Sequence, residues 1–224
     1  MFLEATGLMA IIASIELPKS FKPEFTNYVI STIFKRIRAS VQTIRDEIRG
    51  NVRHAVRAAL IETPEHRSLL GGKLQAELGV PQPEGRLITI IETWINGIEV
   101  ETQVKKGPFL TIDIGILRSS YEDVLSLPAA TYSYSSRHTE GEIPWLRWLL
   151  LEGDKRIVQK YVFKPVRKGS RTGLGIMAET KQGGWRVPPE FAGTELNNFA
   201  TRALEDIDTS IDKIVEKAIK RSLK

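Results

Sequence analysis

The chain has 224 residues, of which 42% are hydrophobic and 26% charged, and it contains no cysteine. These proportions are ordinary for a globular protein and exclude a wholly disordered chain. The lack of cysteine excludes disulfide scaffolds, thiol catalysis and cysteine-ligated zinc or iron–sulfur sites, and the composition fits a cytoplasmic product. The formal net charge of +5 is small, whereas a dedicated DNA-binding domain usually concentrates more positive charge.

The N-terminal segment, residues 1–17, is apolar but contains Glu4 and Glu16. It lacks the basic start of a signal peptide and the uninterrupted apolar run of a membrane-spanning helix, so we expect neither. Pro18 and Pro23 bracket a short linker. We therefore expect an extension over residues 1–22 that packs on the body or on a neighbouring subunit.

A long helix is predicted from Glu24 to Ile61, because apolar residues recur at steps of three and four. Gly50 is a possible bend in it. Arginines at i, i+4 spacing form a second stripe, which is either a solvated face or a surface that follows DNA phosphates. This stripe consists of Arg45, Arg49, Arg53 and Arg57.

Thr63-Pro64 ends the helix, and a glycine-bearing connector and a turn region follow up to Gly85. Residues 87–95 are dense in Ile and Thr and predict a strand. Asn96-Gly97 then favours a hairpin into an alternating strand over residues 98–104. Residues 110–116 alternate again, which predicts a third strand and a sheet with one apolar face against helices.

Residues 131–141 are polar and turn-like, and a compact helix is expected from Pro144 to Gly153. Residues 156–164 and 174–179 predict two strands on either side of a basic loop over residues 167–173. Gly183-Gly184 predicts a further turn.

One C-terminal helix is expected, because a single apolar stripe runs from Leu196 to Leu223. Its acidic residues precede its basic residues, an order that complements the helix dipole.

Candidate catalytic groups are sparse. His54, His66 and His138 fit no zinc-binding spacing, and adjacent carboxylates such as Asp46 and Glu47 point to different helix faces. The loop Gly169–Gly173 lacks the Gly-Lys-Ser/Thr ending of a phosphate-binding loop, so a hairpin loop or a subunit contact is the expected role. We therefore expect neither an enzyme nor a cofactor or metal site.

Three segments, in this order, carry a resemblance to a known family. Thr63-Pro64 with Gly72-Lys73-Leu74 resembles Ala-Pro…Thr-Gly-x-Leu, and Trp148–Gly153 resembles an aromatic-x-x-apolar-Glu-x-Gly helix. Asn198–Leu204 resembles Pro-Phe-Leu-Arg-Pro-Ala-Leu, with Thr201 in place of the second proline. Together they resemble the tail-completion, tail terminator or neck (head–tail joining) proteins of tailed bacteriophages. Residues 154–194 look like an insertion into that pattern.

The resemblance implies an α+β fold, with an antiparallel or mixed sheet packed against long N-terminal and C-terminal helices. It implies one domain over residues 23–224 and a virion protein made in the host cytoplasm. That protein forms a ring, commonly a hexamer, at the head–tail junction. The ring caps the tail tube, docks it to the head connector and lets DNA pass without sequence specificity; tail tube or sheath proteins are further partners, and neither catalysis nor a membrane is involved.

Ring assembly needs contact residues on unlike surfaces. The candidates for subunit or partner contacts are Phe2, Leu3, Leu8, Trp145, Trp148 and Arg171. A nucleic-acid-binding protein that uses the arginine stripe is the alternative, and an enzyme of unrecognised type is a third.

Overall fold

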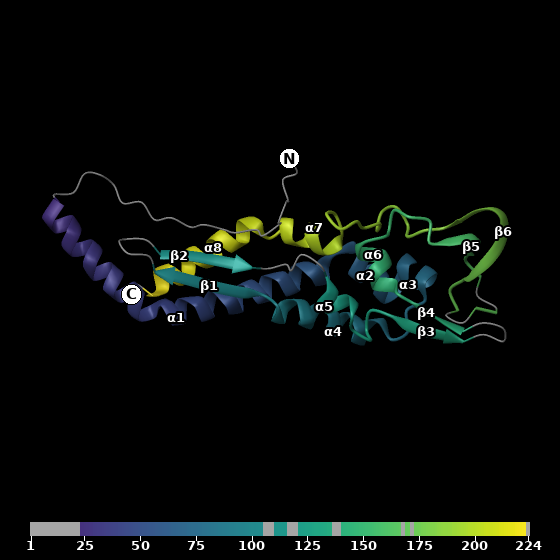
Figure 1. Cartoon of the computed structure of the whole chain (residues 1–224), viewed down its shortest axis with the longest axis horizontal. Coiled ribbons are helices and arrows are strands. Elements are labelled where there is room, and N and C mark those ends of the chain that lie inside the picture. Colours follow the sequence, from purple (N-terminus) through teal and green to yellow (C-terminus); the bar gives the residue numbers. More distant parts are fainter. Residues whose placement is uncertain are drawn as a thin grey trace, which may run out of the picture. The chain divides into compact units, whose positions relative to one another are not determined.

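The computed structural model describes residues 23–104, 110–115, 121–135, 140–166, 169–170 and 173–222 (Figure 1). Their fold is of the mixed α+β class, as expected, with helices and small antiparallel sheets. Within these ranges the strands form three separate two-stranded sheets, so the single sheet expected over residues 87–116 does not form. The expected N-terminal extension, with Phe2, Leu3 and Leu8, and the loop residue Arg171 lie outside the described residues.

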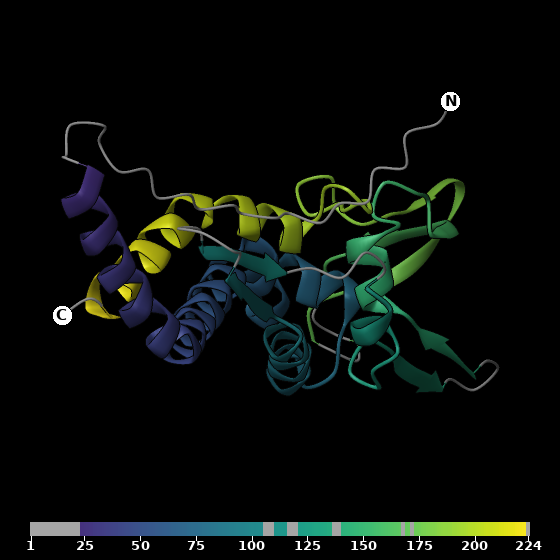
Figure 2. The same cartoon turned by 60° about the vertical axis from the view of Figure 1, so that its left-hand side comes forward.

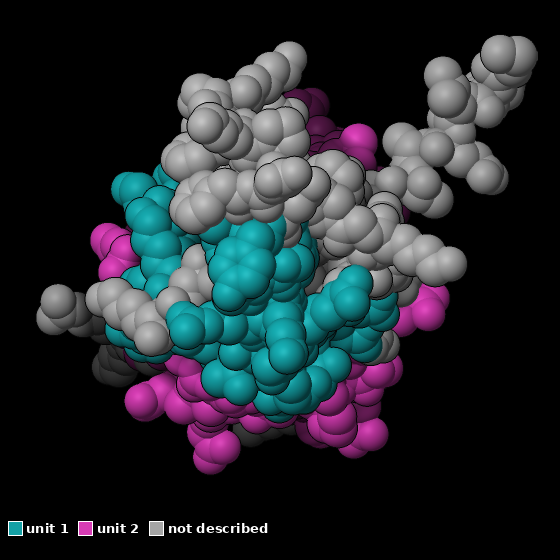
Figure 3. All heavy atoms as spheres, turned by 90° about the vertical axis from the view of Figure 1, so that its left-hand side faces the viewer, with its two compact units in different colours: residues 1–55, 95–119, 207–224 teal, residues 56–94, 120–206 magenta. Residues whose placement is uncertain are grey.

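The chain divides into two compact units, which Figure 3 distinguishes by colour. Unit 1 contains residues 1–55, 95–119 and 207–224, and unit 2 contains residues 56–94 and 120–206. The single domain expected over residues 23–224 stays a prediction, because these units are defined by contacts and a domain by its own core and independent folding.

Unit 1 is built from helices and one hairpin. Helix α1 (Pro23–Glu62) contributes its residues up to Ala55, and helix α8 (Asp208–Ser222) lies beside it in Figures 1 and 2. Arg221 Nη1 donates to Glu47 Oε1 at 2.6 Å between these two helices. The apolar side chains that each helix buries recur at helical spacing, and they include Ile44, Ile48, Val52, Ile211, Val215 and Ala218.

The hairpin of unit 1 confirms two predicted strands. Strand β1 (Glu99–Val104) pairs antiparallel with strand β2 (Leu110–Gly115), in a register that places Glu99 opposite Gly115. Val100 is 2% exposed, whereas Glu99 and Glu101 are exposed. The alternation read from the sequence of β1 is therefore the alternation between its buried and solvent faces.

The helices of unit 2 are short, apart from α4 (Pro83–Asn96), which belongs to this unit as far as Trp94. The others are α2 (Pro64–Gly71), α3 (Lys73–Leu78), α5 (Glu122–Leu125), α6 (Trp145–Leu150) and α7 (Phe199–Glu205). Thr63 begins α2, because its hydroxyl accepts a hydrogen bond from the backbone N–H of His66. The helix predicted over residues 144–153 is confirmed as α6.

Two hairpins complete unit 2. Strands β3 (Tyr132–Ser135) and β4 (Glu140–Ile143) form the first, with Tyr132 opposite Ile143. Strands β5 (Val158–Lys164) and β6 (Ile176–Trp185) form the second, with Val158 opposite Trp185. A register shift between Gln159 and Tyr161 places Lys160 at a positive φ of 61°. This irregularity is a β-bulge, which bends and twists the strand locally.

The strand predicted over residues 87–95 is wrong, because this segment is part of helix α4. Its β-branched residues suggested a strand, but its buried positions follow the helical period. Leu87, Ile90, Ile91 and Trp94 are buried, whereas Ile88 is 55% exposed. Asn96 consequently ends a helix rather than forming the predicted hairpin turn.

Three smaller predictions are also corrected. The expected connector over residues 69–74 contains the end of α2 and the start of α3, which Gly72 separates, and the turn-like region 131–141 contains strand β3 and the start of β4. The predicted turn at Gly183-Gly184 lies within β6, where Gly183 adopts a φ of 96°.

The C-terminal stripe is divided between α7 and α8 by a turn at residues 206–207. Leu196 lies outside both helices and is 88% exposed, so the stripe begins at Phe199. Gly50, in contrast, does not interrupt α1.

Candidate functional site

Unit 2 contains a groove of about 620 Å³ between α3, α6 and the two hairpins. We call it the aromatic groove, because six aromatic side chains line it. These are Tyr132, Tyr134, Trp148, Tyr161, Phe163 and Trp185. Ile143, Val158, Ile176 and Met177 add aliphatic surface, and Glu77 and Glu142 are the carboxylates among its described lining residues.

Buried anchors fix the walls of the groove. Tyr132 is 5% exposed, and its hydroxyl donates to the carbonyl oxygen of Leu78 at the end of α3. Trp185 is 6% exposed, and its Nε1–H donates to Glu77 Oε2 at 2.6 Å. The Trp148 and Trp185 rings lie 5.8 Å apart at an interplanar angle of 59°. These contacts thus connect both hairpins to α3 and α6 around the groove.

Other side chains of the groove remain open to solvent. Tyr134, Tyr161 and Ile176 are each about two-fifths exposed. Glu142 is also exposed, and its Oε1 accepts from the Thr131 hydroxyl at 2.7 Å. Aromatic side chains with one apolar body and one polar tip are enriched where proteins meet other proteins.

Glu77 has the clearest electrostatic perturbation in the groove. Burial raises the pKa of its carboxyl group, while the Trp185 hydrogen bond and the Lys73 ammonium act in the opposite direction. Lys73 Nζ itself lies 2.7 Å from Glu190 Oε1, and this second carboxylate adds to the rise. The Lys73 ammonium is therefore ion-paired with Glu190, while it also attracts the Glu77 carboxylate.

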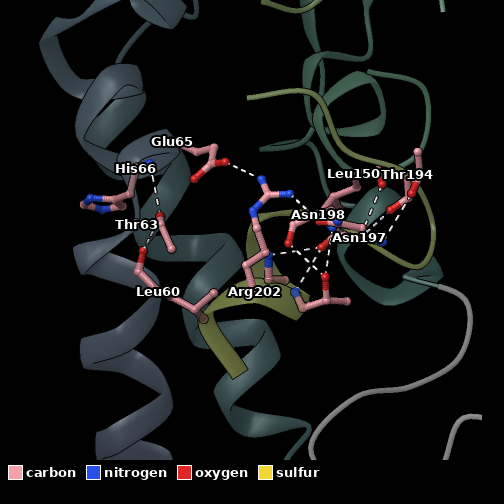
Figure 4. A network of polar contacts seen from close by, with 11 residues as sticks. Leu60, Thr63, Glu65, His66, Leu150, Thr194, Asn197, Asn198 and Arg202 are labelled. Carbon is pink, nitrogen blue, oxygen red and sulfur yellow. Dashed lines mark hydrogen bonds and ion pairs between the residues drawn. The ribbon is translucent and has the colours of Figure 1, made fainter. Parts of the chain in front are cut away.

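The three segments that carry the family resemblance meet in a polar network elsewhere in unit 2 (Figure 4). Thr63 donates from its hydroxyl to the Leu60 carbonyl at 2.8 Å, next to Glu65, which is 2% exposed. Glu65 forms an ion pair with Arg202 of α7, and Arg202 Nη1 also donates to Asn197 Oδ1 at 2.6 Å. The network joins the start of α2 to the start of α7.

Asn198 is the residue around which the rest of this network is arranged. It is fully buried, its side-chain oxygen caps α7, and its amide nitrogen donates to the Thr194 carbonyl at 2.9 Å and the Leu150 carbonyl at 3.4 Å. Gly153 is also fixed by packing, because a Cβ on it would lie 2.4 Å from the backbone nitrogen of Gly193. These residues therefore hold the scaffold of unit 2 together.

The two tryptophans predicted as contact residues have different environments. Trp145 is completely buried and donates its Nε1–H to the Ala129 carbonyl at 2.9 Å. It packs in the core of unit 2 and offers no surface to a neighbour, which corrects that prediction. Trp148 lies in the aromatic groove and is accessible there.

The arginine stripe of α1 is engaged within the chain. Arg45 and Arg49 each lie 3.7 Å from Asp46. Arg53 Nη2 donates to the backbone carbonyls of Asn96 and Ile98 at 3.2 and 3.4 Å. Arg57 forms an ion pair with Glu92. A DNA-facing role for this stripe stays a prediction, and it would require these partners to be given up or shared.

In the described part of the chain, no group of three His, Asp or Glu side chains is placed to hold a metal ion. His54 is exposed, and burial beside Arg67 lowers the pKa of His66. The helices that the structure describes include none long and apolar enough to cross a bilayer.

The sequence did not predict the two carboxylates of the groove, Glu77 and Glu142, or most of its aromatic residues. Only the alternation of Tyr161 and Phe163 along a predicted strand signals a shared face. Comparison with known protein families, with curated proteins and with solved structures found no match to this chain. The resemblance to phage neck proteins therefore stays a prediction.

Proposed function

We propose that this chain is a structural protein of the phage neck, which acts by binding other proteins. In this proposal it forms a ring at the head–tail junction of the virion, caps the tail tube and docks it to the head connector. The observation that carries the proposal is the aromatic groove, whose lining is mostly apolar and includes exposed tyrosines. The ring and its position come from the sequence resemblance alone.

The groove suits a protein segment better than a reacting substrate. Its described lining is dominated by aromatic and aliphatic side chains, with carboxylates on α3 and β4. No described histidine or serine lines it beside these carboxylates, so the described lining contains no serine–histidine pair for nucleophilic catalysis. An apolar patch rimmed by polar groups is the usual form of a protein-binding surface.

The nucleic-acid-binding alternative has one specific observation in its favour, the row of arginines on α1. Each of them already contacts a carboxylate or a backbone carbonyl of the same chain. Binding through four free arginines would give an affinity that falls steeply with salt, with a slope near −0.9 per phosphate on duplex DNA. A steep slope measured by fluorescence anisotropy would favour this alternative over the structural role.

The proposal is tested by light scattering coupled to size-exclusion chromatography over a range of protein concentrations. A closed ring has a mass that is one fixed multiple of the 25.2 kDa chain and stays constant over that range. A chain that remains a monomer throughout would contradict self-assembly. A mass that keeps increasing with protein concentration would show that the subunit contacts do not close into a ring.

A further inference from the structure

We infer that the aromatic groove binds an extended apolar segment of a partner protein that carries one lysine or arginine side chain. The inference rests on the proposed function for the statement that the occupant is a protein. The chemistry of the occupant follows from the groove itself, through the arrangement of its carboxylates and aromatic rings.

The first argument is charge complementarity. Glu77 and Glu142 line the groove, and its described lining includes no lysine, arginine or histidine. The nearby ammonium of Lys73 is paired with Glu190. An anionic segment would therefore be repelled, whereas a cationic side chain would find a carboxylate that lacks a full counter-charge.

The second argument is the position of Glu77 beside aromatic faces. The Trp185 indole holds this carboxylate by its Nε1–H, and the Trp148 ring lies against Trp185. A cation that pairs with this carboxylate shares the groove with the Trp148 ring, which is only partly buried. Cation–π attraction is strongest for tryptophan and grows when the site is partly desolvated.

The third argument is size and accessibility. A volume of about 620 Å³ exceeds that of a single side chain and accommodates several residues. Tyr134, Tyr161 and Ile176 keep exposed surface at the groove. Apolar residues on either side of the cation would bury this surface, and the lysine or arginine stem would pack along it.

The test uses three capped hexapeptides of leucine and phenylalanine that differ at one central position. That position is lysine, norleucine, which keeps the apolar stem without the charge, or glutamate. Each is titrated into the full chain while tryptophan fluorescence is recorded, since Trp148 and Trp185 line the groove. We expect the lysine peptide to bind about 2-fold to 30-fold more tightly than the norleucine peptide, and the glutamate peptide to bind most weakly.

Matched variants locate the effect. Glu77→Gln keeps an acceptor for Trp185 and removes the charge, so the preference for lysine over norleucine should fall while norleucine binding is retained. Glu142→Gln tests the second carboxylate in the same way. Glu205→Gln is the control, because Glu205 is exposed on α7 and does not line the groove.

Equal affinities for lysine and norleucine in the wild-type chain, or no binding of any of the three peptides, would overturn the inference. An equal loss of lysine preference in Glu205→Gln would also overturn it. If the lysine peptide dissociates the chain's own oligomer, the groove is occupied by a second copy of this chain. That result would overturn the inference that the groove binds a different protein. If the chain forms rings but binds the lysine and norleucine peptides equally, only this inference fails. If the chain stays a monomer but prefers the lysine peptide, only the proposed ring fails.

Discussion

The buried ion pair between Glu65 and Arg202 gives the most quantitative prediction. The Glu65 side chain is 3% exposed and that of Arg202 is 36% exposed. Arg202→Met keeps the packing of the stem but leaves an uncompensated carboxylate in the interior of unit 2. Breaking a fully buried pair costs about 3–5 kcal/mol. Because Arg202 is partly solvated, we expect a loss at or just below that range, about 2–3 kcal/mol.

The effect can be measured on unit 2 alone. All four tryptophans lie in this unit, namely Trp94, Trp145, Trp148 and Trp185, so urea unfolding followed by tryptophan fluorescence reports on it. With a slope of about 1–3 kcal/mol per molar urea, the expected loss lowers the midpoint by roughly 0.7–3 M. Glu65→Gln combined with Arg202→Met should recover part of the loss, because the buried charge is then absent.

A surface pair provides the control. Arg147 and Glu152 lie 3.1 Å apart with side chains that are 53% and 28% exposed. Arg147→Met should therefore cost less than about 1 kcal/mol. If Arg202→Met is as mild as Arg147→Met, or if the double variant is no more stable than Arg202→Met, the network in Figure 4 does not hold unit 2 as described.

Three further predictions concern single positions. Gly153→Ala should destabilise unit 2 by about 1–3 kcal/mol in urea unfolding, because the added Cβ would meet backbone atoms of Ala192 and Gly193. Gly50→Ala is the control. A Cβ at Gly50 would have no atom within 4 Å, so this variant should be neutral or stabilising. Ile211→Asp should lower the free energy of unfolding by roughly 3 kcal/mol or more, because the Ile211 side chain is 2% exposed in unit 1. The loss can be measured by urea unfolding followed by far-UV circular dichroism. A variant as stable as the wild-type chain would show that α8 does not pack as described. Glu77 has a raised pKa in the folded chain, so its contribution to stability is present below pH 4.5 and is lost as the pH rises through the folded pKa. Glu77→Gln should therefore gain stability relative to wild type over that window, and a difference that does not change with pH would contradict the cause assigned to the shift.

The sequence predicted elements best where one periodicity was unopposed. Helix α1, helix α6 and strand β1 follow from clear 3.6-residue or two-residue patterns. Helix α4 was misread, because its isoleucines and threonines favour strands locally while tertiary packing buries every third or fourth residue. Asn96-Gly97 reinforced that error, since the same pair suits the end of a helix as well as a hairpin.

The groove could not be predicted in this way. Glu77 and Trp185, whose hydrogen bond fixes one wall, are 108 positions apart, and no local pattern links such residues. The resemblance segments were easier to recognise, because each is a short run of residues that are consecutive or close together in the sequence. In the structure Thr63, Leu150, Asn198 and Arg202 of these runs belong to the polar network of Figure 4, so the runs report on the scaffold of unit 2. The surface that the proposal uses comes from side chains that those runs do not contain, apart from Trp148.

Negative-stain electron microscopy of the purified full chain, over a concentration series, tests the central claim most directly. The proposed neck role predicts ring-shaped particles with a central opening and one subunit number, to which tail tubes or head connectors can dock. Particles of single-chain size at every concentration, or irregular clusters without an opening, would contradict the ring and with it the proposed place of this protein at the head–tail junction.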